Sequence, residues 1–103
     1  MKISIKLLSM HDYLKMTIDT ESNSVVLNSA PVKTDANALA SKICRLASSW
    51  EKKYSNSSVL DGESFEVIIE NNGKEYKFEG KNSYPNNFGD FLELLREVKN
   101  GNM

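Results

Sequence analysis

The most constraining feature of the sequence is a strand hairpin in its second half. Residues 65–70 alternate between two faces, and the return strand from Glu75 to Glu79 alternates in the same way. Between them lies Asn72-Gly73, the preferred pair for a type I′ turn, because both central residues of that turn need positive φ. The inward face of this hairpin is predicted to hold Phe65, Val67, Ile69, Tyr76 and Phe78.

The first third of the chain predicts three more antiparallel strands. Residues 3–7 and 14–18 alternate apolar with polar side chains, which is typical of half-buried strands. A polar run then leads to Val25-Val26-Leu27, a third strand that we expect Pro31 to end.

Two helices are expected from apolar residues spaced by three and four. The first is predicted to start after a cap at Thr34 or Asp35 and to run for five turns, the second to start at a cap on Asn87. Their buried stripes are predicted to be Leu39, Ala40, Ile43, Ala47, Trp50 and Tyr54 in the first helix, and Phe88, Phe91, Leu92, Leu95 and Val98 in the second.

The predicted order is therefore β-β-β-α-β-β-α in a single domain over residues 1–103. An antiparallel sheet with both helices packed on one face satisfies this order, which defines a two-layer α+β fold. A hydrophobic content of 40% with 26% charged residues is in the range of folded globular proteins.

Charge and cysteine usage argue against several function classes. The formal net charge of -1 gives no general attraction to nucleic acid, and no stretch approaches the roughly 20 apolar residues of a membrane span. The only cysteine, Cys44, cannot form an intrachain disulfide, which favours a reducing, cytoplasmic location.

Residues with catalytic or metal-binding potential lack the spacing that such chemistry requires. His11 beside Asp12 is interpreted as a turn histidine, and Cys44 as a packed helix residue, although Arg45 next to it would allow a lowered thiol pKa. Carboxylates such as Asp61 and Glu63 follow no known ligand pattern. We therefore expect a protein without catalytic residues, metal or cofactor.

The sheet face that the helices leave open is the first candidate site. It combines cationic N-terminal strands with an anionic hairpin and includes one aromatic and one aliphatic side chain, an anatomy that suits a protein interface. The alternative is a solvated face with weak attraction between its charges. The candidate partner-binding residues are Tyr13, Lys15, Glu66, Ile68 and Glu70.

The second candidate site is the segment GKNSYPNNFGDF, residues 80–91, where the last strand leads into the last helix. Asn82, Tyr84 and Asn86 could bind a small ligand there. The alternative is a structural hinge, since Gly80 allows close backbone approach and Pro85 holds the preceding residue extended.

The second half of the chain also resembles a group of small, uncharacterised bacterial proteins. The similarity is carried by Asp61-Gly62, the hairpin starting at Phe65, and the pattern G-x-N-x-Y-P-x-N-F of residues 80–88; in that group, tryptophan is commoner at the position of Phe65. The resemblance implies the fold and a bacterial or phage origin, and it carries no catalytic residues.

Together these features predict a non-catalytic protein-binding module that acts stoichiometrically as an inhibitor, immunity or anti-defence factor. It could also self-associate through the same face. The alternatives are an oligomeric small-ligand-binding protein and a structural subunit of a phage or secretion assembly.

Overall fold

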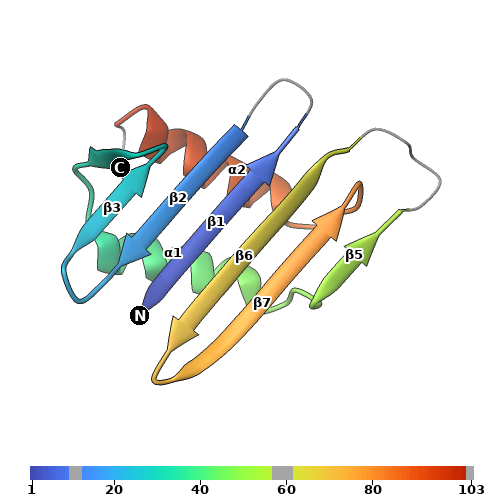
Figure 1. The fold of residues 1–103 in the computed structure, drawn as a ribbon, viewed down its shortest axis with the longest axis horizontal. Helices are drawn as coiled ribbons and strands as arrows, with labels where there is room; N and C mark the ends of the chain where they lie inside the picture. The colour runs from blue at the N-terminus through green and yellow to red at the C-terminus, as the bar shows by residue number, and fades with distance from the viewer. Residues whose placement is uncertain (10–12, 57–61, 102–103) are drawn as a thin grey trace.

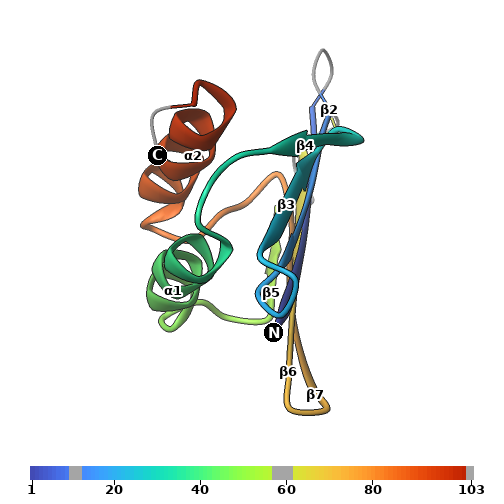
Figure 2. The ribbon, with the colours of Figure 1, turned by 90° about the vertical axis from the view of Figure 1, so that its left-hand side faces the viewer.

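A computed structural model describes residues 1–9, 13–56 and 62–101, and it confirms the α+β class. Two helices cover one face of a seven-stranded sheet (Figures 1 and 2). The elements are β1 (Lys2–Leu8), β2 (Tyr13–Asp19), β3 (Ser24–Leu27), β4 (Ala30–Val32), α1 (Ala36–Ala47), β5 (Lys53–Ser55), β6 (Ser64–Asn71), β7 (Lys74–Lys81) and α2 (Phe88–Lys99).

The strand order is β4-β3-β2-β1-β6-β7-β5, so the N-terminal strands and the later hairpin form one sheet. The join is the antiparallel pair β1–β6 at the centre. After β4 the chain crosses behind the sheet through α1 and adds β5 at the opposite edge, parallel to β7. The sheet is therefore mixed, whereas the sequence predicted a purely antiparallel one.

The predicted alternation sets the register of the central strands. Ile5 lies opposite Met16 on one side and Val67 on the other, and all three side chains are fully buried under the helices. Burying side chains of this size contributes about 1.5–3 kcal/mol each. The inner face of the central sheet is thus the main source of stability.

The third strand ends earlier than predicted. β3 stops at Leu27, and Asn28 and Ser29, with φ of 49° and 70°, turn the chain directly into β4. Pro31 therefore lies within an edge strand rather than after the last one. Proline is tolerated there because an edge strand can leave one side without amide donors.

The first helix is shorter than predicted and ends at Ala47. The Ser48 hydroxyl donates a hydrogen bond to the carbonyl of Arg45. Hydrogen bonds from a serine side chain to the nearby backbone compete with the backbone hydrogen bonds that would continue the helix. Trp50 and Tyr54 follow the helix, and Tyr54 lies in β5 opposite Gly80. Trp50 and Tyr54 continue the three-and-four spacing of the helix only because the segment that follows α1 faces the same core.

The predicted start of α1 and most of the predicted stripe of α2 are confirmed. Asp35 caps α1 by accepting a hydrogen bond from the amide of Ala38 at 3.1 Å. In α2, Leu94 is buried, although it was absent from the predicted stripe, whereas Leu92 is only partly buried.

The predicted hairpin turn is also confirmed, with φ of 52° at Asn72 and 77° at Gly73. The tip of the β6–β7 hairpin projects past the helix layer (Figure 2). Tyr76 lies on the inner face of the sheet, as predicted, but its side chain is 50% exposed because the helices do not reach this part of the hairpin.

Candidate functional site

The sheet face opposite the helices is open across its whole width (Figures 1 and 2). The register places all five predicted partner-binding residues on this face. Tyr13 and Lys15 lie on β2, whereas Glu66, Ile68 and Glu70 lie on β6, with β1 between them.

An exposed apolar pair lies at one end of this face. Leu8 and Tyr13 are direct cross-strand partners and are 50% and 53% exposed. Leu8 was not among the predicted partner-binding residues. Its even position, shared with Lys2 and Lys6, would have placed it outward by the period of two.

The charges on the open face divide into a paired and an unpaired half. Lys77 lies 3.7 Å from a carboxylate oxygen of Glu66 and 3.4 Å from one of Glu79, so the hairpin neutralises part of its own charge. Lys6 and Lys15 are opposite each other on β1 and β2, and neither forms an ion pair with another described residue. Like charges opposite each other are destabilising. Lys6 also lies opposite Glu66 on β6, so Lys15 is the cation of this half that is most available to an outside anion.

The corner at residues 80–88 bonds mainly to the rest of the molecule. Asn82 has a φ of 56°; its amide donates to the carbonyl of Glu63, and its side-chain oxygen accepts from the amide of Glu63. The Tyr84 hydroxyl donates to a carboxylate oxygen of Glu63 at 2.8 Å, and its ring stacks on Phe88. Desolvation, with that carboxylate as a further cause, raises the pKa of Tyr84 to about 12. Asn86 is exposed.

Asn87 occupies the predicted cap position of α2, but its side chain makes no capping hydrogen bond. Instead its oxygen accepts from the Trp50 indole at 2.6 Å, and its nitrogen donates to the carbonyl of Leu46 at 2.9 Å. The predicted capping role is therefore replaced by a bridge between the two helical segments.

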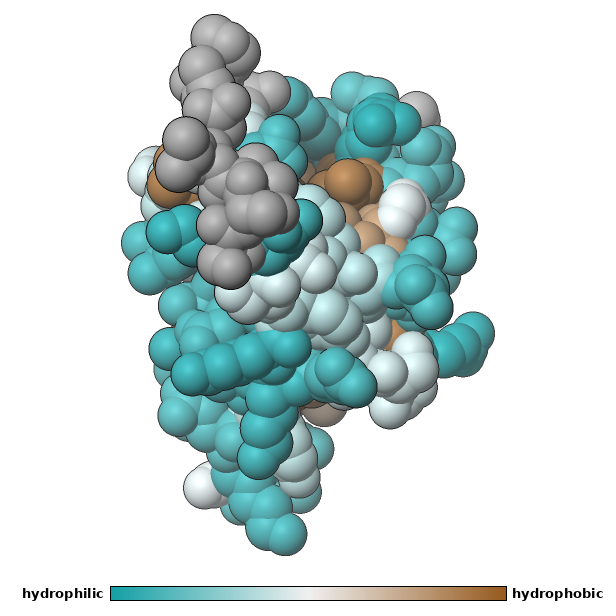
Figure 3. Space-filling model, turned by 90° about the vertical axis from the view of Figure 1, so that its right-hand side faces the viewer, coloured by the Kyte–Doolittle hydropathy of each residue, from teal (hydrophilic) through white to brown (hydrophobic). Residues whose placement is uncertain are grey.

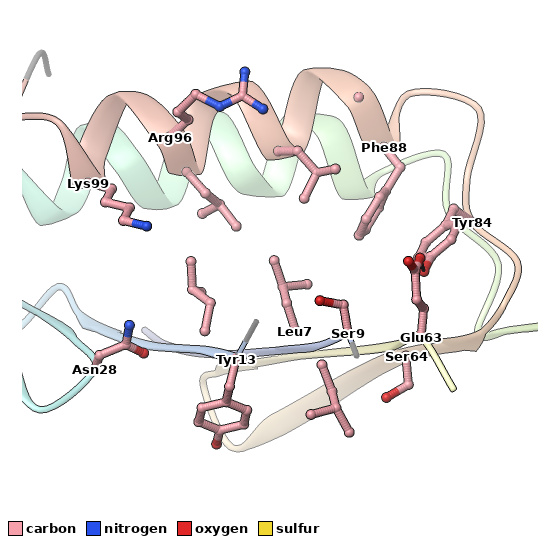
Figure 4. Close-up of a pocket in the computed structure, with 15 residues that line it drawn as sticks. Leu7, Ser9, Tyr13, Asn28, Glu63, Ser64, Tyr84, Phe88, Arg96 and Lys99 are labelled. Carbon is pink, nitrogen blue, oxygen red and sulfur yellow. Dashed lines mark hydrogen bonds between the residues drawn. The ribbon is translucent and has the colours of Figure 1, made fainter. Parts of the chain in front are cut away.

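A cleft with a volume of about 640 Å³ lies between the sheet and α2. Figure 4 shows leucines of the sheet and of α2 facing one another across it, with Tyr84 and Glu63 at one end and Asn28 and Lys99 at the other. Figure 3 shows apolar surface in a hollow between the two layers, with polar surface on both sides. Of the three predicted ligand-binding residues, only Tyr84 lines this cleft.

The remaining chemical candidates form no centre in the described part of the chain. Burial raises the pKa of the Cys44 thiol, which is opposite to the lowered value that an activated cysteine would need. Within residues 1–9, 13–56 and 62–101, no three potential metal ligands gather. His11 and Asp61 lie outside the described residues.

Comparisons with protein-family models, with curated proteins and with solved structures found no match for this chain. Neither helix of the described segments is long and apolar enough to cross a membrane. The open sheet face and the cleft are therefore the two features of the molecule from which a function can be proposed.

Proposed function

We propose that this protein is a non-catalytic binding module that engages a protein partner through its open sheet face. A stoichiometric inhibitor or immunity factor, of bacterial or phage origin and acting in the cytoplasm, is the kind of protein that such a module would be. The observation that carries the proposal is the exposed Leu8–Tyr13 pair next to Lys6 and Lys15.

The anatomy of this end of the face supports the proposal. Interface energy is concentrated in a few large side chains, with tyrosine among the commonest, and surrounding polar groups exclude water and select the partner. Tyr13 and Leu8 supply an anchor, while Lys6 and Lys15 favour an acidic surface around the complementary pocket. Glu66 and Glu70 would add contacts to basic groups of the same partner.

Affinity capture from bacterial and phage-infected lysates, with quantitative mass spectrometry, tests the proposal. The wild type should retain one protein at a fixed stoichiometry, and Tyr13→Ala should weaken its binding about thirtyfold, as expected for a tyrosine that contributes about 2 kcal/mol. Tyr76→Ala is the matched control, because Tyr76 is equally exposed but lies on the other face of the sheet.

Charge-reversal variants show which half of the open face contacts the partner. Lys15→Glu should weaken an acidic partner, and reversal of Glu66 and Glu70 to lysine should weaken a partner that also covers the hairpin. If Tyr13→Ala retains the captured protein at the wild-type level, the assignment of the face is refuted. A native mass of two chains that Tyr13→Ala reduces to one would identify the partner as a second copy.

A further inference from the structure

The cleft between the sheet and α2 has apolar walls contributed by both layers. The lining residues Leu7 and Leu14 belong to β1 and β2, and the lining residues Leu92 and Leu95 belong to α2. Three of these side chains, those of Leu7, Leu14 and Leu92, are only partly buried, although they border the core. Their surfaces are therefore available to a ligand that enters between the layers.

The two ends of the cleft differ in charge. At one end Lys99 extends from α2 toward the sheet, and Asn28 turns its amide nitrogen toward the same space (Figure 4). The Asn28 oxygen already accepts a hydrogen bond from the amide of Lys15, which orients the side chain. At the other end the carboxylate of Glu63 accepts from the Tyr84 hydroxyl.

This polarity selects the head group of an elongated ligand. Lys99 forms no ion pair with another described residue. Arg96 also lines the cleft, but its guanidinium is turned away from the sheet (Figure 4) and is paired with Glu93 at 2.7 Å. The full charge of Lys99 exceeds the roughly half charge of the opposite sign at the end of α2. An anionic head is therefore favoured beside Lys99 and disfavoured beside Glu63.

We propose that the cleft binds an amphiphilic carboxylate of medium chain length, with its alkyl chain among the leucines and its carboxylate at Lys99 and Asn28. The volume of about 640 Å³ falls in the range of small-molecule sites. From Phe88 to Lys99, α2 is about 16 Å long at a rise of roughly 1.5 Å per residue, which accommodates an extended alkyl chain of this class. The leucines of this site lie on the helix side of the sheet, whereas the proposed protein interface is on the open side; Leu8 and Tyr13, at the end of β1 and the start of β2, border both.

The test uses the purified full chain and three probes with the same alkyl group: dodecanoate, dodecylammonium and dodecanol, each below its aggregation limit. Isothermal titration calorimetry at pH 8 should give saturable, one-to-one binding of dodecanoate in the micromolar range. The ammonium and the alcohol should bind at least tenfold more weakly. Methyl NMR signals of Leu92 and Leu95 should shift on binding, while those of Val25, buried elsewhere in the core, should not.

Variants locate the site. Leu92→Trp and Leu14→Phe fill the cleft from opposite walls, and each should weaken dodecanoate at least tenfold while the NMR spectrum remains that of a folded chain. Lys99→Gln should weaken it by up to about fivefold, as expected for an exposed ion pair. Lys74→Gln, an exposed lysine at the far hairpin tip, is the matched control and should change nothing.

Two results would overturn the inference. The first is an absence of saturable dodecanoate binding, or binding that survives both filling variants. The second is dodecylammonium binding as tightly as dodecanoate, which would contradict the head-group argument. Ile68→Ala changes the open face at a residue that does not line the cleft, and it should leave dodecanoate binding unchanged, so the cleft and the protein interface can fail independently.

Discussion

Asn87 should be the polar residue whose substitution lowers the stability of the fold most. Its side chain joins the Trp50 indole to the carbonyl of Leu46, so it ties the start of α2 to the end of α1. Asn87→Ala removes both bonds at once. Asn86→Ala is the control, because Asn86 is an exposed neighbour of the same type.

The magnitude follows from the groups left without partners. Trp50 is only 8% exposed, so its N–H cannot recover full hydration. An unsatisfied buried donor or acceptor costs about 1–3 kcal/mol, and the partly buried setting places each of these two groups near the lower end. We expect Asn87→Ala to lower the free energy of unfolding by about 2–3 kcal/mol, a large part of the roughly 5–15 kcal/mol typical of a domain.

Urea unfolding followed by far-UV circular dichroism measures this change. With a slope of about 1–3 kcal/mol per molar urea, the midpoint should fall by about 0.7–3 M. A double-mutant cycle with Trp50→Phe should give a coupling of about 1 kcal/mol, because the two side chains share a hydrogen bond. A loss for Asn87→Ala within about 0.5 kcal/mol of that for Asn86→Ala, or strict additivity in the cycle, would refute the reasoning.

Two further predictions concern the same corner. Gly80→Ala should destabilise the fold by about 1–3 kcal/mol in urea unfolding, because a Cβ there would overlap the ring of Phe65. Gly89→Ala is the control, because a Cβ at Gly89 would meet no atom within 4 Å, and it should not destabilise the fold. Equal losses for the two variants would contradict the steric argument. The pKa of Tyr84 is raised from 10.0 to about 12, so the neutral phenol is favoured in the folded state. Its contribution to stability should be complete below about pH 10 and lost as the pH rises through 12, and Tyr84→Phe should flatten this part of a pH series of unfolding curves. An identical pH dependence in both proteins would show that titration of the Tyr84 hydroxyl does not contribute to stability in this range.

The sheet was predictable because a period of two is local information. Each central strand carries its own alternation, and Asn72-Gly73 fixes the register of one hairpin without help from the rest of the chain. The presence of the two helices was equally clear from the spacing of their apolar residues. What the pattern could not supply was the pairing of β1 with β6, since these strands are far apart in the sequence.

The error over Trp50 and Tyr54 has a physical cause. Both side chains face the same core as α1, so their spacing continues the helical stripe although the backbone has left the helix. Tertiary contacts decide the matter: the Trp50 ring meets Phe78 at 5.6 Å and Phe91 at 5.1 Å between centroids, and a continued helix would separate it from β7. Helix periodicity alone cannot distinguish these cases.

Of the two candidate sites, one could be predicted from the sequence and the other could not. The open face followed from alternation, because every second residue of a strand lies on it, and only Leu8 was overlooked. The cleft was beyond sequence reasoning, because its walls come from β1, β2 and α2 and its volume depends on the distance between the layers.

Large side chains are unevenly distributed along the cleft between the layers. Near the start of α2 the space between the layers is filled by aromatic rings, which contact one another through Trp50 and Phe88. Farther along α2, leucines such as Leu7 and Leu92 line the cleft, and their side chains are smaller than the aromatic rings. The segment 80–88 anchors the aromatic end of the cleft through the Asn87 and Tyr84 side chains. We therefore expect Asn87→Ala to change dodecanoate affinity as well as stability, whereas Asn86→Ala should change neither.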